Sequence, residues 1–193
     1  MATTLTTSIS KSSPSPALII PHSSLHLSYG DLHRLTDAFQ RNLASIGITP
    51  KSAVSIALPN NLEFIVSFLA AAGQRAVAAP LNPNYKQAEF EFFINDIQSK
   101  LVIVPAGAVK NDAPAVKAAR KFSAGIAEVW WDERRKEVVL DVKEAGKLDG
   151  EQGADVEAAQ EEDVALVLHT SGTTGRPKAV RFYPGEGERG WRG

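Results

Sequence analysis

The chain alternates short apolar runs with longer segments whose apolar residues recur at helical spacing. Runs of four to eight apolar residues are typical of strands, whereas apolar residues three and four positions apart indicate one buried face of a helix. The first helix is predicted over 30–46, where Leu35 and Phe39 lie four residues apart. Ser28 and Asp31 fit a capping box at its start, because each side chain can accept the other residue's backbone N–H.

Strands and helices are predicted to alternate along most of the chain. The strands are expected at 17–20, 25–28, 53–58, 76–79, 101–104, 126–131, 138–142 and 164–168. The helices are expected at 30–46, 62–74, 86–98 and 115–122. Alternation at this short spacing indicates βαβ units, and the strand at 138–142 follows a charged turn that favours antiparallel pairing. The predicted fold class is α/β, with a mainly parallel sheet.

The last predicted strand leads directly into a polar segment. Val164–Leu168 is apolar without a break, as expected of a strand buried on both faces. Ten residues follow, His169 to Lys178, and they are rich in hydroxyl groups and glycine. Glycine lets the backbone approach a ligand and turn its N–H groups inward, while hydroxyls and an ammonium group add further donors. A strand that delivers such a segment to its carboxyl end is typical of phosphate-binding α/β proteins.

This segment resembles a known phosphate-binding signature. Residues 170–178 read Thr-Ser-Gly-Thr-Thr-Gly-Arg-Pro-Lys. The signature of the AMP-forming acyl-adenylate enzymes, which include acyl- and aryl-CoA synthetases, runs Thr-Ser-Gly-(Ser/Thr)-(Thr/Ser)-Gly-x-Pro-Lys-Gly. All nine positions agree, and Ala179 stands where the family usually has glycine. A P-loop of the Walker A type does not fit, because Pro177 precedes the lysine and no Ser or Thr follows it.

The resemblance extends towards the amino terminus. The segments Ile-Ala-Leu-Pro-Asn-Asn (56–61) and Ala-Ala-Pro-Leu-Asn-Pro-Asn-Tyr (78–85) come in the order seen at the start of adenylate-forming enzymes. The Asn82-Pro83-x-Tyr85 turn and the Leu168-His169 pair are most similar to the oxalate–CoA ligase branch. The implied fold is the N-terminal part of the large domain of an adenylate-forming enzyme, incomplete within this chain.

Three segments are expected along the chain. Residues 1–16 are interpreted as a disordered Ser/Thr-rich tail, 17–180 as a partial AMP-binding domain, and 181–193 as a Gly/Arg-rich tail outside the family pattern. After Val180 the family usually continues Pro-Leu-x-His and then supplies the acyl pocket, the adenine and ribose contacts, a magnesium-binding glutamate and a catalytic lysine. We therefore interpret 181–193 as foreign to the fold, from a retained intron, a shifted frame or a truncated gene model.

The resemblance implies a reaction and its participants. ATP would adenylate a small carboxylic acid with loss of pyrophosphate, and coenzyme A would capture the acyl group as a thioester. ATP with Mg²⁺ and coenzyme A are the implied cofactors and co-substrates. By match to the motif, the residues expected to hold ATP phosphates are Thr170, Ser171, Gly172, Thr173, Thr174, Gly175 and Lys178. His169 is expected either to face the nucleotide or acyl site or to be a packed or exposed histidine. The sequence assigns no catalytic residue and no metal ligand.

Two interpretations of function stay open. The first is a truncated AMP-forming acid–CoA ligase, for oxalate or another small carboxylate, without turnover from these residues alone. The second is a non-catalytic truncated isoform that binds at most nucleotide phosphates or a partner. The Gly-x-Gly-x-x-Gly at 185–190 supports neither, because no strand precedes it and no helix can follow it. Glu161, Glu162 and Asp163 are interpreted as a solvated acidic face.

Composition excludes several classes of protein and of binding site. A formal net charge of −1 offers no basic surface for nucleic acid, and the absence of cysteine excludes disulfides and thiolate metal sites. No apolar run reaches the roughly 20 residues of a transmembrane helix, and no secretory signal is recognised at the amino terminus. We expect a soluble protein, cytoplasmic or peroxisomal, without a nucleic-acid partner or membrane span. Its oligomeric state is left open.

Overall fold

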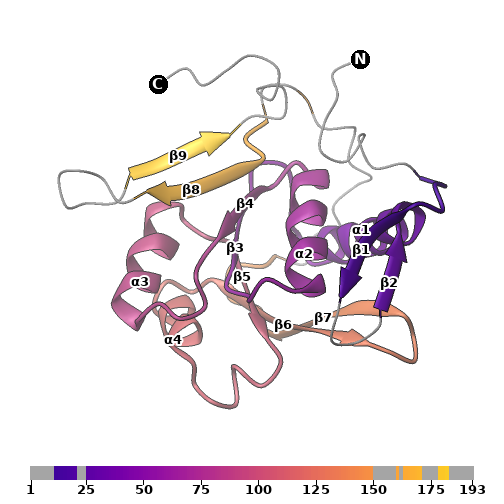
Figure 1. Cartoon of the computed structure of the whole chain (residues 1–193). Coiled ribbons are helices and arrows are strands. Elements are labelled where there is room, and N and C mark those ends of the chain that lie inside the picture. Colours follow the sequence, from indigo (N-terminus) through magenta and orange to yellow (C-terminus); the bar gives the residue numbers. More distant parts are fainter. Residues whose placement is uncertain (1–10, 21–24, 150–159, 161–162, 171–177, 183–193) are drawn as a thin grey trace.

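The structure is a computed structural model that describes residues 11–20, 25–149, 160, 163–170 and 178–182. Within them, a seven-stranded mixed sheet carries helices on both faces, and a two-stranded hairpin lies to one side (Figure 1). The strands are β1 (Pro16–Ile20), β2 (Leu25–Ser28), β3 (Ala53–Ile56), β4 (Val77–Pro80), β5 (Leu101–Pro105), β6 (Gly125–Asp132), β7 (Glu137–Glu144), β8 (Leu166–Thr170) and β9 (Lys178–Phe182). The helices are α1 (Tyr29–Ser45), α2 (Leu62–Gly73), α3 (Gln87–Asp96) and α4 (Pro114–Lys121).

The strand order of the large sheet is β7-β6-β5-β3-β4-β8-β9. The inner strands β6, β5, β3, β4 and β8 are parallel, and the edge strands β7 and β9 are antiparallel to their neighbours. The predicted α/β class, the mainly parallel sheet and the antiparallel strand near 138–142 are thus confirmed. Each predicted helix or strand end lies within two residues of the observed one.

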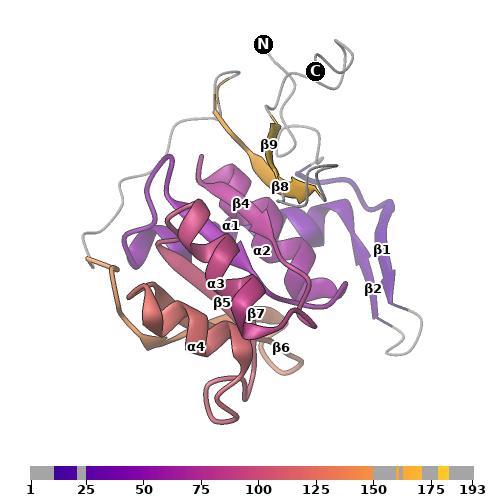
Figure 2. The same ribbon diagram turned by 90° about the vertical axis from the view of Figure 1, so that its left-hand side faces the viewer.

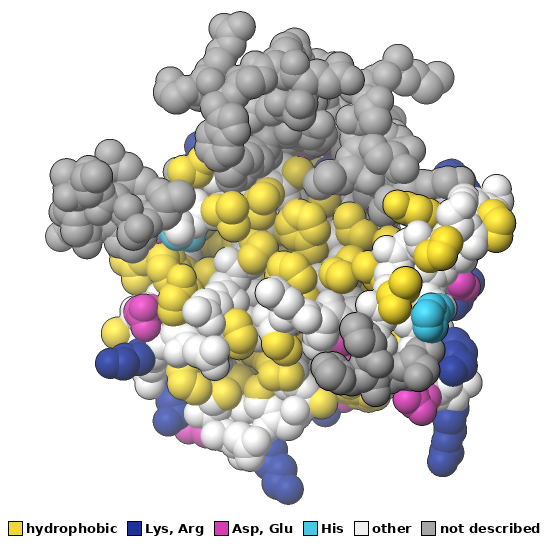
Figure 3. Space-filling model, in the orientation of Figure 1, with side chains coloured by type: hydrophobic (Ala, Val, Ile, Leu, Met, Phe, Trp, Pro, Cys, Tyr) yellow, Lys and Arg dark blue, Asp and Glu magenta, His cyan; other side chains and the backbone are white. Residues whose placement is uncertain are grey.

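The helices form a layer on each face of the sheet (Figures 1 and 2). On one side, α1 and α2 pack over Leu101 and Ile103 of β5, and on the other α3 and α4 pack over Val102 and Val104. This division follows from the period of two in a strand, which points successive side chains to opposite faces. Hydrophobic side chains also gather across the middle of the face seen in Figure 3.

Local signals define where the helices begin and end. Ser28 Oγ accepts the N–H of Asp31 and the Asp31 carboxylate accepts the N–H of Ser28, both at 3.1 Å, which confirms the capping box. Asn61 caps α2 by accepting the N–H of Phe64 at 2.9 Å. Gly47, with φ of 84°, follows the end of α1, where a positive φ favours glycine.

Two details of the sequence interpretation differ from the structure. The strand expected at 164–168 lies at Leu166–Thr170, so His169 and Thr170 belong to β8 rather than to a loop. β9 was not predicted, and it runs through Phe182, past the expected boundary at 180. Pairing with β8 supplies the backbone hydrogen bonds of β9, and such tertiary pairing leaves little trace in the local side-chain pattern.

The beginning of the chain also differs in part from the predicted tail. The carbonyl groups of Ser13 and Ser15 accept backbone N–H groups at the start of α1, from Gly30 at 3.1 Å and Tyr29 at 3.0 Å. Pro16 begins β1. Residues 1–10 and 183–193, the greater part of the two predicted tails, lie outside the described residues. No helix in the described ranges combines the length and apolar character needed to cross a membrane.

Candidate functional site

The exits of β3 and β4 enclose a cavity of about 460 Å³. The chain leaves β3 for α2 on one face of the sheet and leaves β4 for α3 on the other. Parallel sheets bind ligands where neighbouring strands send their connections to opposite faces, because the two loops diverge there and leave a crevice. The lining residues are Leu58, Pro59, Asn60, Phe64, Pro80, Leu81, Asn82, Pro83 and Asn84. All of them except Phe64 of α2 come from the two segments that carry the upstream part of the family resemblance.

The predicted phosphate-binding segment connects β8 to β9. β8 lies beside β4 in the sheet and is parallel to it, and Thr170 at its end pairs with Lys178 at the start of β9. The structure therefore brings the backbones of these two predicted site residues opposite each other. Five further predicted site residues lie outside the described residues: Ser171, Gly172, Thr173, Thr174 and Gly175.

His169 is a packed histidine. Its Nε2 lies 3.0 Å from Oδ2 of Asp96, and its side chain is 3% exposed. The imidazole centroid lies 4.5 Å from that of Phe93 and 6.2 Å from that of Phe92. An ionised carboxylate only accepts hydrogen bonds, so Nε2–H is the donor of this pair. The structure thus places His169 against Asp96 and Phe93.

The start of β8 is held by an ion pair between Arg75 and Asp163. Nε and Nη2 of Arg75 donate to Oδ2 and Oδ1 of Asp163 at 2.7 and 3.1 Å, and the N–H of Gln160 donates to Oδ2 at 2.8 Å. Burial by itself raises the pKa of Asp163, but hydrogen bonds from Arg75 and Gln160, together with the charges of Arg75 and Lys51, outweigh it and hold that pKa below its ordinary value. The interpretation of Asp163 as part of a solvated acidic face is wrong, since its side chain is 6% exposed.

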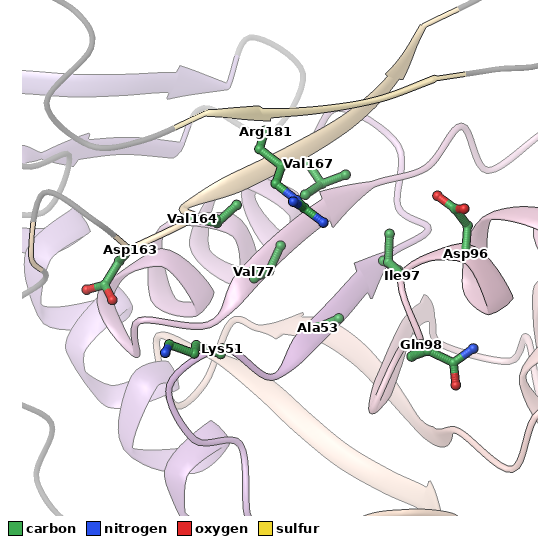
Figure 4. A pocket seen from close by; sticks show the side chains of 10 residues that line it. All are labelled: Lys51, Ala53, Val77, Asp96, Ile97, Gln98, Asp163, Val164, Val167 and Arg181. Atoms are coloured by element: carbon green, nitrogen blue, oxygen red, sulfur yellow. The ribbon is translucent and has the colours of Figure 1, made fainter.

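A second cavity, of about 370 Å³, lies under the β8–β9 hairpin (Figure 4). Val77, Val164 and Val167 give it apolar walls. Figure 4 shows the side chain of Arg181 reaching from β9 towards Val167, and Asp96 standing on α3 at the far side. Among the residues that the structure describes, no three His, Asp or Glu side chains are grouped to hold a metal ion.

Sequence reasoning did not identify Arg75 or Asp96 as partners of this region. Arg75 lies 88 residues before Asp163, and Asp96 lies 73 residues before His169. Neither belongs to a motif. One local feature of Arg75 is its φ of 57°, which is uncommon outside glycine, but a single sequence does not reveal it.

The fold is that of the N-terminal domain of adenylate-forming enzymes. ATP-bound MatB from Rhodopseudomonas palustris superposes with a TM-score of 0.72 over 95% of this chain and 35% of that one, at 22% identity. The O-succinylbenzoate coenzyme A synthetase of Bacillus subtilis, in complex with AMP, gives a TM-score of 0.67 over 94% of this chain and 42% of that one, at 18% identity. These two likenesses concern the fold alone.

The chain belongs to the AMP-binding enzyme family, whose pattern matches residues 5–182. Similar curated proteins include the oxalate–CoA ligase of Saccharomyces cerevisiae, 34% identical over 186 residues, and that of Arabidopsis thaliana, 34% identical over 178 residues. The matches cover 85% and 89% of this chain but 34% and 33% of the relatives. The chain thus spans about a third of the length of these relatives.

Proposed function

We propose that this chain is part of an AMP-forming acid–CoA ligase and that residues 170–178 hold the phosphates of ATP. One observation carries the proposal: in a member of the AMP-binding family, the nine-residue signature begins at the last residue of a parallel strand, and its first and last residues are paired across a hairpin. Hairpin pairing holds Thr170 and Lys178, the first and last residues of the signature, opposite each other.

The chemistry supports this assignment. Attack of a carboxylate on the α-phosphorus releases pyrophosphate, and negative charge gathers on the leaving group. Donors that are already in place lower the barrier, because they need no reorganisation as the charge develops. Hydroxyl and backbone N–H groups of 170–175 would hold the phosphate oxygens, and the Lys178 ammonium would offset their charge.

The proposed substrate is oxalate or another small carboxylic acid, with coenzyme A as acceptor. The support is the similarity to oxalate–CoA ligases of yeast and Arabidopsis. We further propose that these 193 residues alone do not turn over, since they span about a third of those relatives. In the alternative, a non-catalytic isoform, the same segment binds nucleotide phosphates without any ligase reaction.

The test is ATP binding by isothermal titration, beside an ATP–pyrophosphate exchange assay. Lys178→Ala is expected to weaken ATP binding by about tenfold or more, because a hydrogen bond to a charged group is lost. Lys110→Ala is the matched control, since Lys110 is an exposed lysine of the β5–α4 connection. Equal affinities of the wild type and Lys178→Ala, or no ATP binding at all, would refute the phosphate role. Pyrophosphate exchange by the purified chain would contradict the proposed lack of turnover.

A further inference from the structure

β8, which leads into the phosphate-binding segment, is joined to the sheet by a short ladder. Its register with β4 comprises one pair, Ala78 with Leu166, whereas β3 pairs with β4 at four positions and β5 pairs with β6 at five. On its other side β8 pairs with β9 at five positions. The two strands therefore form a hairpin with more backbone pairing inside it than to the rest of the sheet. Side-chain contacts must contribute to its placement.

The described contacts of this kind lie at both ends of β8. Before its first residue, Asp163 receives the bidentate hydrogen bonds of Arg75, which lies between α2 and β4. Near its last residue, His169 binds Asp96 at the end of α3 and packs on Phe93. Figure 1 shows the end of β8 lying over α3, in agreement with these contacts.

The second of these contacts bears on both sides of the phosphate-binding segment. His169 pairs with Ala179 across the hairpin, and the next pair is Thr170 with Lys178. A side chain that fixes the position of His169 therefore also restrains the backbone of β9 where the segment ends. The 3% exposure of the His169 side chain and its contact with Phe93 leave little room for another position of the ring.

We propose that Asp96 is a positioning residue for the phosphate-binding segment and acts through His169. This inference rests on the proposed function of residues 170–178. Asp96 orients the imidazole by accepting from Nε2, and the imidazole holds the end of β8 against α3. A donor array displaced by a fraction of an ångström binds its ligand less well, so the effect of Asp96 should appear in nucleotide affinity.

The experiment compares Asp96→Ala and Asp96→Asn with the wild-type chain. Asp37→Ala is the matched control: Asp37 also accepts a hydrogen bond from a side-chain N–H, that of Arg41, and its side chain is 50% exposed against 43% for Asp96. ATP affinity is measured by titration, amide hydrogen exchange at His169 and Val180 by NMR, and thermal stability by circular dichroism. Asp96→Ala should weaken ATP binding about fivefold, the loss of one hydrogen bond, and should speed exchange at both amides. Asp96→Asn should give an ATP affinity and exchange rates between those of the wild type and Asp96→Ala, because its amide oxygen can still accept a hydrogen bond.

Three results would overturn the inference. Unchanged ATP affinity and unchanged amide exchange in Asp96→Ala would show that the Asp96–His169 contact does not position the phosphate-binding segment. A lower melting temperature without any change in exchange at His169 and Val180 would show a role in stability only. Equal effects of Asp96→Ala and Asp37→Ala would show a general charge effect. If Asp96→Ala does not fold, His169→Gln, which keeps an N–H donor, takes its place. If the wild type binds no ATP, the proposed function fails, while the exchange rates still decide the role of Asp96.

Discussion

Removing the Asp163 carboxylate should destabilise the whole domain. Asp163 accepts three hydrogen bonds, two from Arg75 and one from the N–H of Gln160. The Asp163 side chain is 6% exposed and that of Arg75 is 17% exposed, so little water can replace the lost partner. Loss of one partner of a buried ion pair is costly because the remaining charge loses a buried counter-charge.

The expected magnitude follows from this geometry. Removing one partner of a fully buried ion pair lowers the free energy of unfolding by about 3–5 kcal/mol. Because Arg75 is partly exposed, we expect a smaller loss of about 2–3 kcal/mol for Asp163→Ala. For a chain of this length, 1 kcal/mol shifts the melting temperature by about 2–4 °C, so the expected decrease is about 5–10 °C. Urea unfolding at pH 7, followed by circular dichroism, measures the free energy directly.

The effect should also depend on pH. The pKa of Asp163 in the folded state lies below its ordinary value, so its contribution to stability is present above the pKa of the unfolded state and is lost as pH falls through the folded-state pKa. The difference in unfolding free energy between wild type and Asp163→Ala should therefore shrink on acidification. A difference that grows as the pH is lowered would contradict this sign.

A surface pair provides the control for Asp163→Ala. Asp37 and Arg41 form an ion pair four residues apart on α1, with side chains 50% and 64% exposed. Exposed pairs of this kind contribute little, so Asp37→Ala is expected to change stability by about 0.5 kcal/mol or less. The reasoning fails if Asp163→Ala costs no more than Asp37→Ala. It also fails if Arg75→Gln and Asp163→Ala show no coupling in a double-mutant cycle.

Three further substitutions test other parts of the fold by urea unfolding. Ser55→Ala should lower the free energy of unfolding by about 1–3 kcal/mol, because it leaves the buried Ser99 hydroxyl without its 2.7 Å partner. The double variant Ser55→Ala/Ser99→Ala should be close to neutral, and an equal loss in the single and double variants would contradict this. Gly146→Ala should lower the free energy of unfolding by about 2 kcal/mol or more, since φ is 51° and a Cβ would lie 2.5 Å from a backbone oxygen. A smaller loss than in Gly107→Ala, where φ is also positive but the nearest atom to a Cβ would be 3.9 Å away, would contradict this. Ser28→Ala should cost about 1 kcal/mol through loss of the α1 cap, and an unchanged midpoint would count against that cap.

The sequence predicted those parts of the fold that depend on local patterns. Apolar runs identified the parallel strands because a strand buried on both faces has no polar side to interrupt it. The capping box at Ser28 is equally local, and it lies where it was expected. The family signature could be recognised from the sequence because its residues are consecutive in the chain.

The sequence did not predict contacts made by tertiary pairing. β9 is an edge strand whose residues lack a clear alternation, and its partner β8 determines its extent. Asp163 is the last of three consecutive acidic residues, and such a run is typical of a solvent-exposed surface. Its burial becomes understandable only when Arg75, 88 residues earlier, is placed beside it.

The two parts of the candidate site consequently depend on different kinds of information. The cavity at the exits of β3 and β4 is built from two short segments, 58–64 and 80–84, and contains prolines with fixed φ and Asn82, which accepts the N–H of Asn84. The phosphate-binding segment instead follows a strand whose ladder to the sheet is one pair long and whose ends are held by Arg75 and Asp96. Substitutions far from the segment in sequence should therefore affect it more than they affect the cavity, because its placement depends on long-range side-chain contacts.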